Sequence, residues 1–315
     1  MDPLPTGSLS WRQRLRDFVA LTKPRIVLLL LVTTLVPMIV AARGWPGTRL
    51  VLATLIAGYL MAGSANAMNM AIDADIDRYM GRTALRPIPA GRMRRRTAVR
   101  FSLMAGAVAT AIFLWLVHPL AALLAVAGWV YYVGLYTLGL KRRSPHNIVI
   151  GGGAGAFPPL VGWAAVTGTV SLTALYLFLI VFFWTPPHFW ALALVKEGDY
   201  GRVGVPMAPN VWGPEETARQ MLVYTAVLVV LTLLPVAWGA FGALYLAAAV
   251  ALGGWLLRGV WRLRRAPRAA PMAWGVYRAS LLYLGLLFLA MAVDGLVRPT
   301  GPVLRGPDLP LPPGL

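Results

Sequence analysis

Long apolar runs alternate with shorter polar segments along nearly the whole chain. A helix needs about 20 mostly apolar residues to cross a bilayer. Runs of about that length cover residues 26–42, 50–68, 99–117, 120–139, 148–166, 171–194, 220–237, 240–257 and 276–296. None has an acidic or basic side chain near its middle, and Asp294 lies close to the end of the last one. The pattern predicts an all-α integral membrane protein with nine transmembrane helices.

The composition agrees with a membrane protein. Hydrophobic residues make up 58% of the 315-residue chain and charged residues 13%, whereas soluble domains carry about 25% charged residues. A net charge of +18 would suggest nucleic acid in a soluble protein. Here the basic residues lie between the apolar runs, so we expect the lipid bilayer, and no nucleic acid, as the partner. The absence of cysteine excludes thiolate nucleophiles and cysteine-bound metals.

The distribution of basic residues predicts the orientation. If the N-terminus is cytoplasmic, only Arg43, Arg49, Arg298 and Arg305 of the 29 Lys and Arg residues fall on the outer side. Cytoplasmic loops of membrane proteins carry such an excess of basic residues. We therefore expect a multi-pass protein of the cell (inner) membrane with its C-terminus outside and its active site facing the cytoplasm. The predicted parts are a basic cytoplasmic segment (1–25), a polytopic domain (26–296) and a Pro/Gly-rich tail without fixed structure (297–315).

Three of the eleven acidic residues lie within five positions, just after the second apolar run. Asn69, Asp73 and Asp77 recur at every fourth position, which on a helix places an amide and two carboxylates in one stripe. Asp75 falls roughly on the opposite face, because two helical residues are about 200° apart. Like charges at this spacing are destabilising unless a cation joins them. The arrangement favours a site for a divalent cation and a polyanion over a solvated, salt-bridged loop.

Two further inner loops carry groups that suit such ligands. Mg²⁺ prefers oxygen ligands and is commonly held by one or two carboxylates plus phosphate oxygens. Arginine binds phosphate oxygens bidentately, and lysine acts as a point charge. Aromatic faces can stabilise the allylic cation that a departing diphosphate leaves behind. The predicted metal ligands are Asn69, Asp73, Asp77 and Asp199, the predicted diphosphate ligands are Arg82, Arg86, Lys141 and Arg142, and the predicted contacts to the cation or the acceptor are Tyr136, His188 and Tyr200. Of these, Asp73, Asp77, Lys141 and Arg142 are the predicted catalytic residues.

Other conspicuous segments have simpler interpretations. The arginines at residues 94–96 and 262–265 are typical of topology signals and lipid-headgroup contacts. The glycine-rich residues 151–155 follow no predicted strand, so they favour close helix packing over a phosphate-binding loop. His188, in Pro-Pro-His-Phe-Trp, is either a hydrogen-bonding residue near a helix break or a contact to a planar substrate.

At these residues the chain resembles the UbiA superfamily of intramembrane prenyltransferases, from the segment Thr-Lys-Pro-Arg at residues 22–25 to the ninth apolar run. Asn69, Asp73 and Asp77 match the superfamily signature. Three longer segments, at residues 69–87, 136–152 and 184–207, are similar to the branch that farnesylates protoheme IX, the heme O synthases. One departure concerns the loop after the sixth run, where many members carry a second Asp-x-x-x-Asp. Here that loop has only Glu197 and Asp199.

The resemblance implies nine helices around a central cavity, with the aspartates at its cytoplasmic mouth. It implies farnesyl diphosphate as donor and protoheme (heme B) as acceptor, with heme O as the product and a hydroxyethylfarnesyl chain on a former vinyl group. A downstream heme-modifying or oxidase-assembly protein would be a further partner. The alternatives are a quinone- or chlorophyll-type acceptor, a secondary transporter, which usually places its polar site at mid-membrane, and a membrane scaffold without catalysis.

Overall fold

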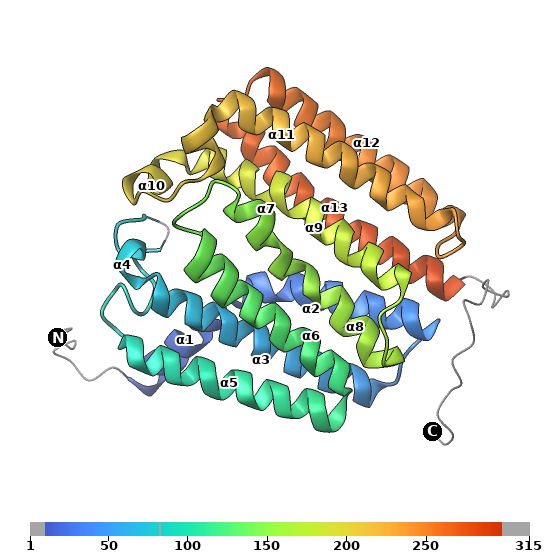
Figure 1. The fold of residues 1–315 in the computed structure, drawn as a ribbon, viewed down its shortest axis with the longest axis horizontal. Helices are drawn as coiled ribbons and strands as arrows, with labels where there is room; N and C mark the ends of the chain where they lie inside the picture. Colours follow the sequence, from blue (N-terminus) through green and yellow to red (C-terminus); the bar gives the residue numbers. More distant parts are fainter. Residues whose placement is uncertain (1–9, 82, 298–315) are drawn as a thin grey trace.

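The computed structural model of the chain describes residues 10–81 and 83–297. Within these ranges the protein consists of helices and their connections, without strands (Figure 1). In chain order the helices are α1 (Trp11–Thr22), α2 (Pro24–Ala42), α3 (Thr48–Ile72), α4 (Ala74–Asp77), α5 (Arg95–Leu116), α6 (Pro119–Val130), the π-helix η1 (Tyr131–Leu140), α7 (Asn147–Gly151), the 3₁₀-helix η2 (Gly152–Ala156), α8 (Phe157–Thr167), α9 (Leu172–Val195), α10 (Glu197–Arg202), α11 (Ala208–Leu233), the 3₁₀-helix η3 (Leu234–Val236), α12 (Ala243–Arg265) and α13 (Ala270–Val297).

Nine helical segments of the described chain are long and apolar enough to cross a membrane. They confirm the nine predicted transmembrane helices. Three of them are built from consecutive pieces, since α6 continues into η1, α7 continues through η2 into α8, and α11 continues into η3. The orientation across the membrane, the three-part division of the chain and the central cavity stay predictions.

Several helices continue beyond the apolar runs that predict them. α3 reaches Ile72, about one turn past the predicted end, and α5 begins at Arg95, about one turn before the predicted start. α11 begins at Ala208, although Gly213 interrupts its helical backbone with φ of 81° and ψ of 163°. A helix satisfies its own backbone hydrogen bonds in lipid and in water alike, so it can extend into polar sequence. Hydropathy alone therefore predicts helices that are shorter than those in the structure.

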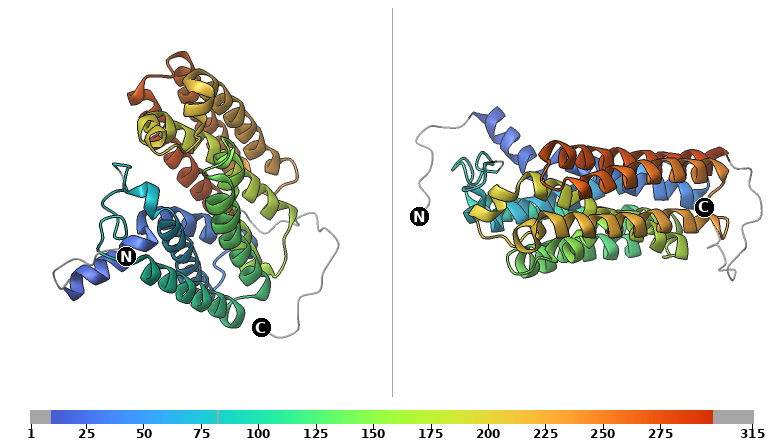
Figure 2. Two further views of the ribbon diagram at one scale, coloured as in Figure 1. Left: turned by 60° about the vertical axis from the view of Figure 1, so that its left-hand side comes forward. Right: turned by 90° about the horizontal axis from the view of Figure 1, so that it is seen from above.

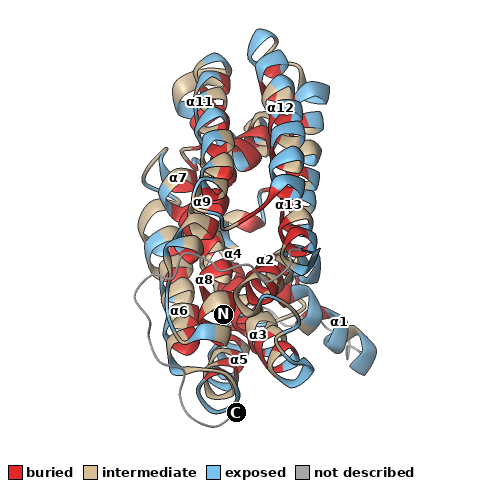
Figure 3. Ribbon diagram, turned by 90° about the vertical axis from the view of Figure 1, so that its right-hand side faces the viewer, coloured by how far each residue is buried: buried red, intermediate tan, exposed pale blue. Residues whose placement is uncertain are grey.

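The long helices lie side by side with roughly parallel axes (Figure 2). α3 packs against α5, α2 against α8, and α9 against both α11 and α13. Buried positions face neighbouring helices, and exposed positions face outward (Figure 3). On α5 the exposed side chains include Leu103, Met104 and Trp115, each more than half exposed. Water would disfavour this apolar surface, whereas bilayer hydrocarbon accommodates it.

The segments that carry the predicted site meet at one end of the bundle. Figure 1 shows α4, α10 and the connection between η1 and α7 at that end, close to the beginning of α5. These segments are far apart in the sequence. The antiparallel course of the long helices returns the chain to the same end after every second span, which brings the three loops together.

Candidate active site

Asp73 stands at the junction of two helices. It lies between α3 and α4 with φ of −86° and ψ of 4°, outside regular helical values. Its N–H donates to the Asn69 carbonyl, and its own carbonyl accepts from the N–H of Asp77, both at 2.9 Å. The Asn69 side chain also donates through Nδ2 to Asp73 Oδ2 at 2.7 Å. The predicted stripe is therefore divided between two helices that meet at Asp73.

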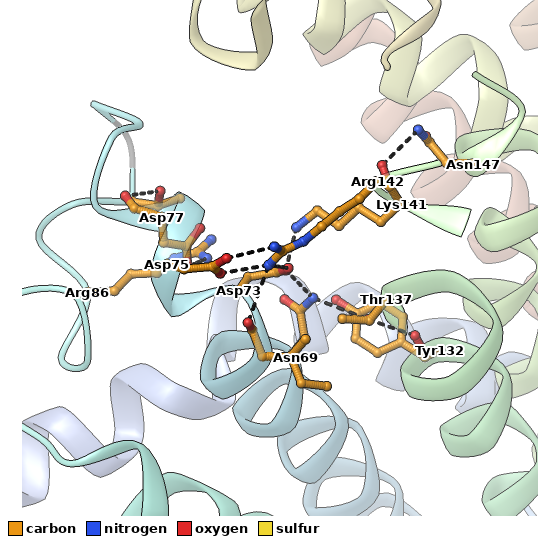
Figure 4. A network of polar contacts seen from close by, with 12 residues as sticks. Asn69, Asp73, Asp75, Asp77, Arg86, Tyr132, Thr137, Lys141, Arg142 and Asn147 are labelled. Atoms are coloured by element: carbon orange, nitrogen blue, oxygen red, sulfur yellow. Dashed lines mark hydrogen bonds and ion pairs between the residues drawn. The ribbon is translucent and has the colours of Figure 1, made fainter. Parts of the chain in front are cut away.

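Two basic side chains from a distant loop reach the Asp73 carboxylate (Figure 4). Lys141 Nζ donates to Oδ2, and Arg142 Nη2 lies 3.4 Å from Oδ1. The Asp73 side chain is completely buried, and that of Lys141 is 15% exposed. Desolvating an ion costs several kcal/mol, which only a well-placed partner offsets. Removing either residue of this pair would leave the other charge buried without its main partner.

Arg142 also binds Asp75 on the outer side of α4. Its two terminal nitrogens donate to the two carboxylate oxygens at 2.7 Å each, a bidentate pair. The Asp75 side chain is 60% exposed, in agreement with its predicted position opposite the buried acids. The hydrogen bonds from Arg142 lower the pKa of Asp75 to about 2, and the same contact raises the pKa of Arg142. One guanidinium thus connects the buried and the exposed carboxylates.

Asp77 has a different basic partner. Arg86 Nη1 donates to its Oδ2 at 2.5 Å, and the Asp77 side chain is 2% exposed. The Thr83 hydroxyl donates to the Asp77 carbonyl at 2.8 Å, which fastens the following loop to the end of α4. The predicted diphosphate ligand Arg82 lies outside the described residues. Among the described residues of this loop, Arg86 forms the ion pair with Asp77.

The π-helix η1 places Lys141 beside the acids. The N–H of Lys141 donates to the Tyr136 carbonyl, and the Thr137 hydroxyl donates to the Tyr132 carbonyl, each across five residues at 2.8 Å. π-Helical segments are rare and occur frequently at functional sites. Gly151 makes room for this one, because a Cβ there would lie 2.2 Å from Tyr136 Cδ2. The glycine confirms the predicted close packing and holds the Tyr136 ring against α7.

Two residues that were not predicted from the sequence complete the surroundings of Asn69. Lys23 Nζ donates to Asn69 Oδ1 at 3.3 Å, and Asn69 Nδ2 donates to the Thr137 hydroxyl oxygen at 3.3 Å. Lys23 joins α1 to α2 with φ of 52°, a left-handed conformation that costs a non-glycine residue about 1–2 kcal/mol. Its place directly before Pro24, at the start of the first span, is a signal in the sequence that could have identified it.

The third inner loop approaches the first without joining its acids. In α10, Asp199 lies 3.8 Å from Arg202, and its Oδ1 is 4.0 Å from the position that a Cβ on Gly81 would take. Tyr200, beside it, packs on the buried core. Among the described residues, no three acidic or histidine side chains are grouped so that they could hold a metal ion together. Asp199 is therefore not gathered with Asp73 and Asp77 in this structure.

The donor chemistry of the first loop nevertheless fits Mg²⁺. Asp73 and Asp77 offer two carboxylates, and Asn69 offers an amide oxygen, all at one end of the bundle. One or two carboxylates are what Mg²⁺ commonly takes when phosphate oxygens supply further ligands. Each carboxylate also contacts a basic side chain, so a metal ion would share or replace that contact.

His188 lies inside α9 in a stack of aromatic rings. The two prolines before it do not interrupt α9, so the helix break in the first of the two predicted interpretations is wrong, whereas its hydrogen-bonding role is found. The imidazole stacks on Trp184 and on Tyr277, with centroid distances of 4.3 and 4.7 Å and interplanar angles of 18° and 24°. Its Nδ1 lies 2.8 Å from the Ser280 hydroxyl. Because rings cover both faces, a planar substrate cannot stack on His188 and can meet only its edge.

The fold and the charged cluster define a multi-pass helical membrane protein with a polar site at one end of its bundle. The chain belongs to the UbiA prenyltransferase family, which matches residues 30–282.

Curated relatives resemble the chain over most of its length. It is 53% identical over 289 residues to a protoheme IX farnesyltransferase of Chloroflexus aurantiacus, covering 91% of this chain and 49% of that one. It is 50% identical over 282 residues to a protoheme IX farnesyltransferase of Gloeobacter violaceus, covering 90% and 92%. The chain therefore spans about half the length of the Chloroflexus relative and most of the Gloeobacter one.

Solved structures share the fold at low sequence identity. A structure of a digeranylgeranylglyceryl phosphate synthase has a TM-score of 0.75 at 19% identity, covering 90% of this chain and 99% of that one. A UbiA homologue from Archaeoglobus fulgidus, bound to GPP and Mg²⁺, has a TM-score of 0.62 at 14% identity, covering 87% and 99%. These likenesses establish the UbiA fold of the chain.

Proposed function

We propose that the chain transfers a farnesyl group from farnesyl diphosphate to a vinyl group of protoheme IX. The products are heme O, which carries a hydroxyethylfarnesyl chain, and diphosphate. The observation that carries the proposal is the convergence of Lys141 and Arg142 on Asp73, next to Asn69 of the family signature. The names of relatives about half identical to this chain support the farnesyl and protoheme specificity.

The charged end of the bundle binds the diphosphate of the donor. Lys141, Arg86 and Arg142 are 15%, 18% and 38% exposed, so they are partly shielded from water and still within reach of a ligand. Charge-assisted hydrogen bonds are stronger in such surroundings than in bulk water. When the allylic C–O bond ionises, negative charge moves onto the diphosphate, and these groups stabilise it there.

Mg²⁺ is the proposed cofactor, held by Asp73 and Asp77, with Asn69 and Asp199 as further oxygen donors. When bound, it supplies positive charge that neutralises the departing diphosphate. The pairing of GPP with Mg²⁺ in the Archaeoglobus homologue supports this choice. Asn69 orients the Asp73 carboxylate through its Nδ2, and Lys23 and Thr137 hold the Asn69 amide.

The acceptor meets the allylic cation beside the aromatic side chains. The faces of Tyr136 and Tyr200 stabilise the cation, and His188 contacts the acceptor through its ring edge. The vinyl group attacks the allylic carbon, which forms a C–C bond and leaves a carbocation next to the tetrapyrrole. Water adds to that carbocation and loses a proton, which gives the hydroxyl group of the product. By holding donor and acceptor together, the bundle removes much of the entropic barrier to their encounter.

The proposed setting is the cell (inner) membrane, with the N-terminus and the charged end on the cytoplasmic side. The excess of basic residues in the inner loops supports this orientation. The heme O product would pass to a heme-modifying or oxidase-assembly protein.

The test is a reconstituted reaction. Purified, folded protein is incubated with heme B, farnesyl diphosphate and Mg²⁺, and heme O is measured by mass spectrometry together with released diphosphate. A parallel reaction with a quinone-type aromatic acceptor checks the specificity. We expect heme O in the first reaction, none after chelation of Mg²⁺, and no prenylated quinone. Failure to form heme O, or preference for the quinone-type acceptor, would reject the proposed function.

A further inference from the structure

The hydrogen bonds around Ser280 determine the tautomer of His188. The Ser280 hydroxyl donates its single hydrogen to the Tyr277 carbonyl at 2.8 Å. A hydroxyl group has one proton to donate and lone pairs that accept. With that hydrogen given to Tyr277, we assign the 2.8 Å contact between Ser280 Oγ and His188 Nδ1 as a bond in which Nδ1–H donates. Because a neutral imidazole carries one proton, Nε2 presents a lone pair.

Neighbouring aromatic rings fix the orientation of the His188 imidazole. Trp184 and Tyr277 cover its two faces, and the stack continues from Tyr277 to Trp274 at 5.0 Å and 16°. Trp184 Nε1 donates to the Ser280 carbonyl at 2.8 Å, so Ser280 joins α13 to α9 through both its backbone and its side chain. Phe189 also packs edge-on against the ring at a centroid distance of 5.2 Å, and Nε2 has no hydrogen-bond partner among the described residues.

We infer that His188 Nε2 is a ligand to the iron of the tetrapyrrole acceptor. The inference rests on the proposed function, which supplies an iron porphyrin as substrate. Neutral imidazole is a common ligand of iron. Histidines that ligate metals almost always donate their other ring N–H to an acceptor that orients them, and Ser280 is that acceptor here.

The depth of His188 suits this role. It lies seven residues before the end of α9, which is about 10 Å of helix. α9 ends at the charged end of the bundle, where α10 begins. An iron bound at His188 would therefore lie inside the bundle, while the diphosphate of the donor stays with Lys141 and Arg142 at the end.

The other two histidines of the chain provide matched controls. His118 accepts through Nδ1 from the N–H of Leu120 at 3.1 Å, so its neutral form carries the proton on Nε2, opposite to His188. His146 is exposed and rests against Trp212 at a centroid distance of 5.2 Å. Neither is held by two ring faces and a hydrogen bond from Nδ1.

The test uses ferric protoheme without farnesyl diphosphate. Absorption and resonance Raman spectra of the purified full-length protein should report an imidazole-ligated iron. His188→Ala should lose that signature and bind protoheme about tenfold or more weakly, a change of about 1.4 kcal/mol. Imidazole added to His188→Gly should restore the signature.

The wild type should prefer protoheme to metal-free protoporphyrin IX, and His188→Ala should bind both alike. His118→Gln and His146→Gln should match the wild type.

Variants of Ser280 test whether this residue orients the His188 imidazole, while the imidazole itself stays in place. Ser280→Ala removes the acceptor of Nδ1–H, so protoheme affinity should fall on the order of tenfold, and the iron–imidazole stretching band should shift. Ser280→Thr keeps a hydroxyl and should restore both. A purely structural role for Ser280 would lower the unfolding temperature and leave that band in place, which would contradict its positioning role.

The outcomes separate the inference from the proposed function. If the wild type makes heme O but His188→Ala and His188→Gly keep the wild-type iron signature, the inference fails and the proposed function stands. Loss of turnover with an unchanged signature would assign His188 to proton transfer and also overturn ligation. If the wild type neither makes heme O nor binds protoheme, both proposals fail together.

Discussion

The two acidic loops at the polar end of the bundle hold their carboxylates in different ways. After α3, Asp73 and Asp77 are 0% and 2% exposed; Asp73 contacts Lys141 from the loop after η1, and Asp77 contacts Arg86 from the loop that follows α4. After α9, Asp199 is 17% exposed, and its basic contact is Arg202 of the same short helix at 3.8 Å. Tertiary contacts hold the buried carboxylates of the first loop in place. The carboxylate of the second loop has its basic contact within its own helix. Groups arranged in advance stabilise developing charge without reorganisation, so the first loop should dominate catalysis.

The strongest test of this difference removes a carboxylate from the first loop. Asp73→Ala should lower the turnover of heme O formation by about a thousandfold, because it removes a proposed metal ligand and the partner of Lys141. Turnover is measured with saturating donor and acceptor. Asp75→Ala, on the exposed side of the same helix, is the control and should retain most activity. Full activity of Asp73→Ala would rule out its role at the metal.

A second test measures stability instead of activity. Lys141→Met leaves the buried Asp73 carboxylate without its main partner, which should cost about 3–5 kcal/mol of unfolding free energy. The double variant Asp73→Asn with Lys141→Met should recover much of that loss, since no unpaired charge remains. Thermal unfolding in detergent gives both values. Arg202→Met in the second loop is the control, and an equal loss there would contradict the comparison.

A third test concerns the metal dependence of the second loop. If Asp199 is a further oxygen donor to Mg²⁺, Asp199→Asn should raise the Mg²⁺ concentration for half-maximal turnover about tenfold, which corresponds to about 1.4 kcal/mol. The unfolding temperature should remain unchanged, because the residue has no distant ion-pair partner among the described residues. An unchanged Mg²⁺ requirement would remove Asp199 from the proposed ligands.

The smallest expected effect is on acid stability. Arg142 lowers the pKa of Asp75 from its ordinary 3.8 to about 2. A carboxyl group with a lowered pKa stabilises the folded state above its ordinary pKa, and this contribution is lost as the pH falls toward 2. Because Asp75 is exposed, the contribution should be at most about 1 kcal/mol. Asp75→Asn should flatten the loss of stability between pH 4 and pH 2, and superimposable curves would contradict this.

The transmembrane helices could be predicted from the sequence because length and hydropathy are local properties. The helix ends could not: α3 continues through Asn69 to Ile72 because its polar last turn is held by tertiary contacts. The four-residue spacing predicted that Asn69 and Asp73 would meet, and they do. The spacing contains no information on which loop supplies the basic side chains that contact the acids.

The tertiary partners of the site were correspondingly the hardest to predict. Lys23 reaches Asn69 from a helix junction 46 residues away, and Ser280 reaches His188 from 92 residues away. The position of Lys23 before Pro24 could have marked it as a site residue, but neither that segment nor the sequence around Ser280 indicates which residue is contacted. Arg142 was predicted to bind diphosphate, but its bidentate contact with the exposed Asp75 could only come from the structure.

The left-handed lysine between α1 and α2 has a consequence for protein engineering. Lys23 and Arg43 are the only non-glycine residues of the described chain with positive φ, and a routine stabilisation screen would replace Lys23 with glycine. The substitution would relieve about 1 kcal/mol of backbone strain and improve the yield of folded protein. It would also remove the Lys23 ammonium group that donates to Asn69, a residue of the family signature. Selection for thermal stability at this position would therefore remove the contact between Lys23 and Asn69. This is an instance of the general conflict between stability and activity.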